Sequence, residues 1–202
     1  MDIAKFYDDR TIYPESHKAS HWSSEHFQQE NFNFAYQIGP LERTDNILDL
    51  GCGYGDLHKF FKDRNFQGHY EGIDVSPKVI AIARKRHLAK FTCIDFLDDK
   101  FQNTYDWIFA LGPFNLVVEN QDEYLRQNLQ KMYRLARKGF YVFFTSDYCP
   151  KGETYLYYYD PVKVMQECLK ITHTFNINQV VAKNGFLLYM YNKEWLDTPL
   201  KT

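Results

Sequence analysis

The chain has 202 residues, of which 45% are hydrophobic and 18% aromatic, and its formal net charge is −2. This length and apolar content fit a single domain over residues 1–202. The small negative charge lacks the basic footprint of a nucleic-acid-binding protein, and no apolar run approaches the length of a membrane span. Neither nucleic acid nor membrane is therefore an expected partner.

The cysteines and the start of the chain bear on the cellular compartment. Cys52, Cys93, Cys149 and Cys168 form no C-x-x-C pair of the kind that binds zinc or works as a redox couple. Nothing near Met1 resembles a secretory signal. We therefore expect a reduced, cytoplasmic protein without a metal site, and the sequence leaves its oligomeric state open.

The first segment, residues 1–44, is polar and rich in aromatic side chains. Within it, Phe27, Phe34 and Ile38 recur at helical spacing, which predicts a helix over Ser24–Ile38. We expect the whole segment to form a helical lead-in, or lid, ahead of the main fold.

Beyond residue 46 the pattern alternates between short apolar strands and helices. Strands are expected at Ile47–Leu50, Tyr70–Ile73, Phe91–Ile94, Tyr105–Leu111 and Phe140–Thr145. Helices are expected at Asp56–Asp63, Pro77–His87, Asp122–Ala136 and Val162–Leu169. Ser76 is suited to cap the helix that begins at Pro77, and Lys138-Gly139 is expected to stop the helix before the last of these strands.

The C-terminal part departs from this alternation. Ser146–Pro161 is a tyrosine-rich insert, and Thr172–Val181 with Phe186–Asn192 predicts a hairpin whose turn is Asn184-Gly185. Alternating strands and helices require a mostly parallel sheet covered by helices on both faces. We therefore expect an α/β fold with a doubly wound sheet and an antiparallel C-terminal strand.

The run from Ile47 to Leu57 carries the strongest functional signal. An apolar strand contains Asp49 near its end, and glycines follow at alternate positions, Gly51, Gly53 and Gly55. Glycine lacks a Cβ atom, so the backbone can turn sharply and place its amides against a ligand. A second strand ends at Asp74, at the distance where nucleotide-binding folds place the acid that grips ribose hydroxyls. These features predict a site for a nucleoside cofactor.

The glycine spacing narrows the choice of cofactor. In the dinucleotide fingerprint G-x-G-x-x-G the third glycine comes one residue later than Gly55 does here. Asp49 would repel a diphosphate and suits an ammonium group. The run resembles the first motif of the class I S-adenosylmethionine-dependent methyltransferases, an acid followed by L-G-x-G-x-G. The resemblance implies a seven-stranded Rossmann-like sheet, S-adenosyl-L-methionine as cofactor and S-adenosyl-L-homocysteine as product.

The same resemblance implies roles for residues at the strand ends. Asp49 and the glycine turn would hold the methionine part of the cofactor, and Asp74 would accept hydrogen bonds from the ribose. Asp95 matches the acid that accepts from the adenine amine, although a turn or helix-cap role is an alternative for it. The expected cofactor-binding residues are Asp49, Gly51, Cys52, Gly53, Asp74, Val75, Asp95, Phe96 and Leu111.

The segment after the fourth strand, Leu111-Gly112-Pro113-Phe114-Asn115, bears on the methyl acceptor. It is similar to the N-P-P-Y loop of amino-group methyltransferases, but Gly112 replaces the first Asn, which weakens the case for methylation of a nucleic-acid base. A closer resemblance, over nearly the whole chain, is to a group of small bacterial methyltransferases. Its matching motifs here are Trp22, Leu48–Leu57, Leu111–Asn115 and Tyr158–Pro161.

Two departures from that group limit what the resemblance implies. Leu111 stands where the group usually has Ser, and Asn31 stands where it often has Arg, so a carboxylate-binding role for that helix has no support. The resemblance implies a fold and a cofactor, but no particular substrate.

Methyl transfer itself needs a nucleophile held close to an electrophilic carbon, with water excluded. Our candidate catalytic residues are Asn115, Tyr158 and His21, and His17 and Asp147 are further candidate bases. The tyrosines of the insert either line a substrate pocket or pack on the edge of the sheet. We expect methyl transfer to an N or O atom of a small molecule. The alternatives are a nucleic-acid or protein acceptor and a non-catalytic cofactor-binding module.

Overall fold

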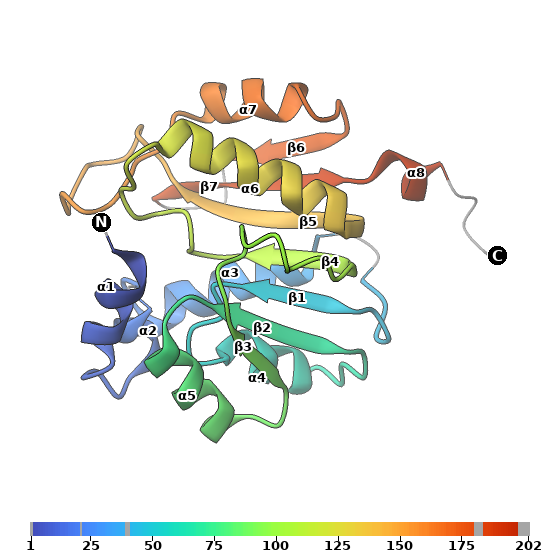
Figure 1. Ribbon diagram of the computed structural model, residues 1–202. Coiled ribbons are helices and arrows are strands. Elements are labelled where there is room, and N and C mark those ends of the chain that lie inside the picture. Colours follow the sequence, from blue (N-terminus) through green and yellow to red (C-terminus); the bar gives the residue numbers. More distant parts are fainter. Residues whose placement is uncertain (1, 21, 39–40, 180–183, 198–202) are drawn as a thin grey trace. The chain divides into compact units, whose positions relative to one another are not determined.

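The computed structural model describes residues 2–20, 22–38, 41–179 and 184–197 (Figure 1). Contacts between Cα atoms divide the chain into two compact units, Met1–Phe101 and Gln102–Thr202. In the described part of the chain, no helix combines the length and the apolar character that a membrane crossing requires.

The first unit begins with helices and continues as a three-stranded parallel sheet in the order β3-β2-β1. The helix expected over Ser24–Ile38 is confirmed, with Ser24 as its N-cap accepting a bond from the Phe27 amide. The elements of the first unit are α1 (Ile3–Arg10), α2 (Ser16–Ala19), α3 (Glu25–Tyr36), β1 (Ile47–Leu50), α4 (Asp56–Lys62), β2 (Tyr70–Asp74), α5 (Pro77–Arg86) and β3 (Lys90–Cys93).

Burial explains why these segments take this structure. All four residues of β1 are buried, as in a parallel strand covered on both faces. Helices α3 and α4 pack through aromatic rings, with Phe32 and Phe60 at a centroid distance of 5.5 Å. The predicted cap of α5 is confirmed, because the Ser76 hydroxyl accepts from the Val79 amide at 3.1 Å. The Ser76 cap fixes the connection that follows Asp74, the last residue of β2.

The second unit contains four strands in the order β4-β5-β7-β6. Strand β4 is parallel to β5, whereas β7 is antiparallel to both of its neighbours, β5 and β6. Fully buried rings, among them Trp107, Phe140 and Phe144, form its core. Its elements are β4 (Tyr105–Ala110), α6 (Gln121–Leu135), β5 (Ala136–Thr145), α7 (Pro161–Leu169), β6 (Phe175–Asn178), β7 (Gly185–Tyr191) and α8 (Lys193–Leu196).

The seven strands belong to one mixed α/β sheet, mostly parallel, with the C-terminal strands paired antiparallel. This is the predicted fold class. The hairpin expected at the C-terminal end is confirmed by the pairing of β6 with β7. Of the predicted turn, Asn184 is a turn residue, but Gly185 is the first residue of β7 and pairs with Thr145; residues 180–183 lie outside the described residues.

The predicted start of the fifth strand is wrong. The sequence placed a helix stop at Lys138-Gly139 and the start of a strand at Phe140, but β5 begins at Ala136, directly after α6. Gly139 lies inside this strand, paired with both neighbouring strands. A Cβ atom there would overlap the carbonyl oxygen of Met190. The glycine therefore serves close strand packing and does not end a helix.

Candidate cofactor site

The glycine turn between β1 and α4 has a backbone that suits few other residues. Gly51, Gly53 and Gly55 have φ values of 73°, 54° and 85°, in the left-handed region. A Cβ atom on Gly55 would lie 2.7 Å from the His87 ring and 2.8 Å from the Phe91 ring. The backbone conformation thus favours glycine at all three positions, and at Gly55 the lack of space for a Cβ atom requires it as well.

Asp49 is a buried carboxyl group next to this turn, with 3% of its surface exposed. Its Oδ2 accepts a hydrogen bond from the Tyr70 hydroxyl, and the Tyr70 ring packs against His58 at 5.0 Å. Burial raises the pKa of Asp49 to about 7; the charges of Asp74 and Asp56 also raise it, and the Tyr70 bond opposes them. No cationic side chain pairs with Asp49 in the described part of the chain.

Asp74, at the end of β2, connects the glycine turn to the start of α5. Its Oδ2 accepts from the Gly53 amide at 3.2 Å, and its Oδ1 accepts from the Ser76 amide at 3.0 Å. Burial raises the pKa of Asp74 to about 6, backbone hydrogen bonds from Ser76, Gly53 and Val75 lower it, and the charge of Asp8 raises it. Each carboxylate oxygen has a second lone pair, so Asp74 can accept further bonds from hydroxyl groups.

The remaining expected cofactor residues of this unit lie in the glycine turn and in the segments that follow β2 and β3. The Cys52 thiol is buried and donates to the Gly53 carbonyl, and the Val75 carbonyl accepts from the Cys93 thiol. The Asp95 carboxylate is exposed and accepts from the Leu97 amide at 2.9 Å. This contact is the turn geometry that the sequence left as an alternative for Asp95.

Phe96 follows Asp95 and, unlike it, is buried. Its ring packs against Phe101 at a centroid distance of 5.7 Å. A ring fixed in this way keeps the segment after β3 in place at the carboxyl end of that strand.

In the second unit, the expected cofactor residue Leu111 and the candidate catalytic residues Asn115 and Tyr158 lie in the loops after β4 and β5. Leu111 is buried directly after β4. The Asn115 side-chain oxygen accepts a hydrogen bond from the Thr145 amide at 3.0 Å. The side-chain NH₂ group of Asn115 can therefore donate to a bound methyl acceptor. The Tyr158 hydroxyl accepts from the Gly152 amide at 2.7 Å.

The tyrosine insert is tied to the loop after β4 by Tyr159. Its buried hydroxyl donates to the Phe114 carbonyl at 2.9 Å and accepts from Gln121 at 2.6 Å. The Tyr157 ring meets the Tyr159 ring edge-on at 4.6 Å. One carboxylate oxygen of Asp147 is buried without a hydrogen-bond partner in the described part of the chain.

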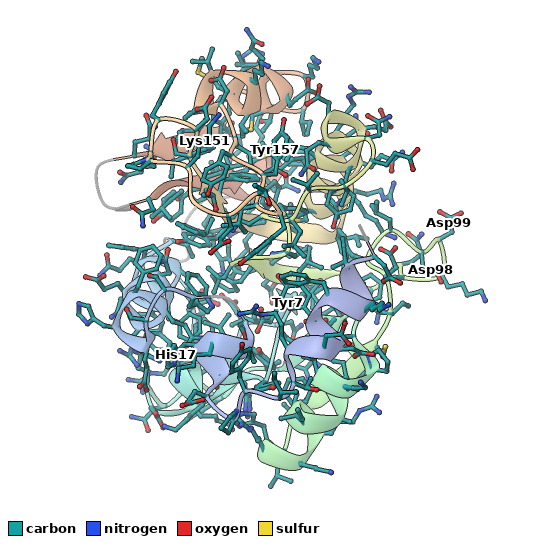
Figure 2. The ribbon with its side chains drawn as sticks, turned by 90° about the vertical axis from the view of Figure 1, so that its left-hand side faces the viewer. Tyr7, His17, Asp98, Asp99, Lys151 and Tyr157 are labelled. Atoms are coloured by element: carbon teal, nitrogen blue, oxygen red, sulfur yellow. The ribbon has the colours of Figure 1, made fainter. Side chains whose placement is uncertain are left out.

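The candidate histidines of the lead-in give a mixed result. His21 lies outside the described residues. His17, labelled in Figure 2, is on α2 and lines a cavity of about 520 Å³ together with Asp56 and ten other residues, most of them polar or charged. This cavity is lined by neither Asp49 nor Asp74. Among the described residues, no cluster of His, Cys, Asp or Glu could hold a metal ion.

The sequence did not reveal the supporting roles of Tyr70 and Asp8. Tyr70 was interpreted only as a strand residue, and a polar-tipped aromatic at the start of a buried strand is a weak signal of a buried partner. Asp8 Oδ1 accepts from the Ser76 hydroxyl at 2.5 Å, across 68 positions of sequence. No local pattern indicates a contact of that range.

Comparisons with known proteins decide the family. Residues 47–139 match the family described as a methyltransferase domain. The chain is 30% identical over 129 residues to a putative methyltransferase of Mycobacterium tuberculosis, a match that covers 61% of this chain and 78% of that protein. The chain belongs to the S-adenosylmethionine-dependent methyltransferases.

Two further proteins show how far the methyltransferase likeness extends. A trans-aconitate 2-methyltransferase of Mycobacterium tuberculosis is 29% identical over 103 residues, 51% of this chain and 39% of that protein. The crystal structure of magnesium protoporphyrin IX methyltransferase from Synechocystis PCC 6803 with bound S-adenosylmethionine has a TM-score of 0.67 and 15% identity. That match covers 94% of this chain and 95% of the other. The match to this crystal structure confirms the fold.

The cofactor of this methyltransferase is S-adenosylmethionine, and the residues of the first unit fit it. The positive-φ glycine turn offers backbone groups without side chains. Asp49 is a buried acid with no counter-charge among the described residues, and the cofactor carries an ammonium group. Asp74 has lone pairs to accept from ribose hydroxyls.

Proposed function

We propose that the protein transfers the methyl group of S-adenosylmethionine to a nitrogen or oxygen atom of a small-molecule acceptor. The observation that carries the proposal is a pair of acids next to the glycine turn, Asp49, which is buried, and Asp74, which is half-buried and bonded to the Gly53 amide. Burial raises the pKa of both carboxyl groups. A ligand that supplies a positive charge and hydroxyl donors would therefore stabilise their charged forms.

The cofactor residues would then divide by the part of the ligand that they contact. Asp49 with the glycine turn would hold the methionine tail, and Asp74 would hold the ribose. The adenine would lie against the segments after β2 and β3. The residues that we assign to the cofactor are Asp49, Gly51, Cys52, Gly53, Asp74, Val75, Asp95, Phe96 and Leu111.

When bound, the cofactor supplies a methyl carbon that the adjacent sulfonium makes electrophilic. The protein's task is to hold the acceptor atom in line and to exclude water. We assign Asn115 to orienting the acceptor through its side-chain NH₂, because its oxygen is already bonded to Thr145. Tyr158 and His21 are the candidates for holding or removing the acceptor's proton.

Charge and the cysteines support the choice of acceptor and compartment. The net charge of −2 does not favour a nucleic-acid acceptor. Two of the similar proteins are named for small molecules, magnesium protoporphyrin IX and trans-aconitate. Cys52, Cys93 and Cys168 are free thiols, which supports a reducing, cytoplasmic location.

A panel of amines, phenols and carboxylates tests the proposal, with S-adenosylhomocysteine release measured by mass spectrometry. We expect one class of acceptor to release product above the background without acceptor. Asp74→Asn should weaken cofactor binding at least tenfold, since it removes charged hydrogen bonds to the ribose.

Three results would overturn parts of this proposal. A folded wild-type protein that binds neither cofactor nor product would refute the assigned site. Binding without turnover of any acceptor would instead indicate a binding module. Salt-sensitive retention on tRNA, with methylation of that RNA, would make the acceptor a nucleic acid.

A further inference from the structure

Helix α1 carries a carboxylate that reaches the start of α5. Asp8 Oδ1 accepts from the Ser76 hydroxyl at 2.5 Å and from the Lys78 amide at 3.2 Å. The same Ser76 hydroxyl accepts from the Val79 amide, as the helix cap. The first turn of α5 is therefore capped twice, once by its own serine and once by a residue 68 positions earlier.

Ser76 links Asp8 to the acid that we assign to the ribose. Ser76 is fully buried, and its backbone amide donates to Asp74 Oδ1 at 3.0 Å. The other oxygen of Asp74 accepts from Gly53 in the glycine turn. The orientation of the Asp74 carboxylate thus depends on backbone amides, one of which belongs to the residue that Asp8 holds.

Other contacts keep α1 in position against the glycine turn. Tyr7, on α1 (Figure 2), packs with Ala19, Tyr54 and Val79. The Tyr54 hydroxyl donates to the Tyr13 carbonyl at 3.2 Å. The helix is therefore attached to the turn by packing as well as through Asp8, and loss of the Asp8 bonds need not release it.

We propose that Asp8 is a positioning residue for the cofactor: through Ser76 it fixes the turn that presents the Asp74 carboxylate to the ribose hydroxyls. This inference rests on the proposed role of Asp74. Asp8 itself does not contact the cofactor in this account. It also brings a second negative charge to the start of α5, a place where the exposed amides and the helix dipole favour anions.

Calorimetric titration with two ligands tests the proposal, S-adenosylhomocysteine and its 2′-deoxy analogue, which lacks one ribose hydroxyl. Wild-type protein should prefer the complete ligand. Asp8→Ala should weaken binding of the complete ligand about tenfold, the equivalent of one hydrogen bond to a charged group. It should weaken binding of the analogue less, so that the preference for the ribose hydroxyl shrinks.

Two other variants make the result specific. Asp9→Asn changes the same charge one position along α1, at an exposed residue, and should bind like wild type. Asp8→Asn keeps an oxygen acceptor and should fall between wild type and Asp8→Ala. Circular dichroism and the melting temperature establish that each variant is folded.

The outcomes separate this inference from the proposed function. Equal weakening of both ligands by Asp8→Ala, or no weakening, would overturn the positioning role, because a merely structural defect does not distinguish the two ligands. If Asp74→Asn keeps the full preference for the ribose hydroxyl, the proposed role of Asp74 fails instead. If wild-type protein binds neither ligand, the cofactor site itself is refuted.

Discussion

The strand ends of the two units are supported in different ways. In the first unit, both carboxylate oxygens of Asp74 accept hydrogen bonds from backbone amides, and the buried Asp49 accepts one from the Tyr70 hydroxyl. In the second unit, the side chains of Asn115 and Tyr158, in the loops after β4 and β5, each accept one hydrogen bond from a backbone amide. Charge is fixed in place in the first unit, whereas the second presents amide and aromatic groups.

We propose that this difference divides the two tasks of the enzyme. A cofactor that carries charge and hydroxyl groups needs fixed acids, and the first unit has them. An acceptor needs shape and a few polar contacts, and the second unit offers tyrosines and an amide. Substitutions in the first unit should change cofactor binding, and substitutions in the second should change turnover.

The largest expected effect comes from Gly55→Ala. The new Cβ would overlap the His87 and Phe91 rings, and alanine disfavours a φ of 85°. We expect a loss of about 3 kcal/mol in the free energy of unfolding, measured by denaturant titration. The matched control is Gly112→Ala in the second unit, where a Cβ would meet nothing within 4 Å. If both variants are equally stable, the spatial argument for the turn is wrong.

The next effect is expected at Asn115. Asn115→Ala should lower turnover about tenfold while cofactor affinity stays within about twofold, since it removes an orienting group and leaves the first unit intact. Asn120→Ala is the control. Asn120 caps α6, and its loss should lower the free energy of unfolding by about 1 kcal/mol without changing the strand ends. A loss of cofactor affinity in Asn115→Ala would contradict the division of tasks.

A smaller effect is expected from Tyr70→Phe. The Tyr70 hydroxyl bond lowers the pKa of Asp49, so its removal should raise that pKa further and leave less ionised carboxylate at neutral pH. We expect product affinity at pH 7 to fall about threefold, measured by calorimetry. Tyr141→Phe removes a buried hydroxyl that has no partner in the described chain, and should leave the affinity unchanged. An unaffected Tyr70→Phe would show that this bond does not matter for the ligand.

The two regions also differed in how well sequence predicted them. The run from Ile47 to Gly55 combines a buried strand with glycines whose conformations are local, so a local pattern suffices to find it. The start of β5 was misplaced because no turn separates α6 from Ala136, so helix and strand signals adjoin. Helix α1 was not delimited, since it has no fully buried residue to mark an apolar face.

The contacts that hold the acids could not be predicted at all. Tyr70 reaches Asp49 across neighbouring strands, and Asp8 reaches Ser76 only because α1 folds back onto α5. Both contacts depend on tertiary packing, which has no signature at the spacing of a motif. Sequence thus located the acids of the candidate site and missed the groups that orient them.

The most direct test of the account is the affinity for S-adenosylhomocysteine as a function of pH. Burial raises the pKa of Asp49 to about 7 and that of Asp74 to about 6, and the ligand's ammonium and hydroxyl groups favour the ionised carboxylates. Protonation therefore competes with binding, and the affinity should fall at least tenfold between about pH 7.5 and about pH 5. An affinity that stays flat or rises toward pH 5, in protein that remains folded, would contradict the claim that these two acids hold the cofactor.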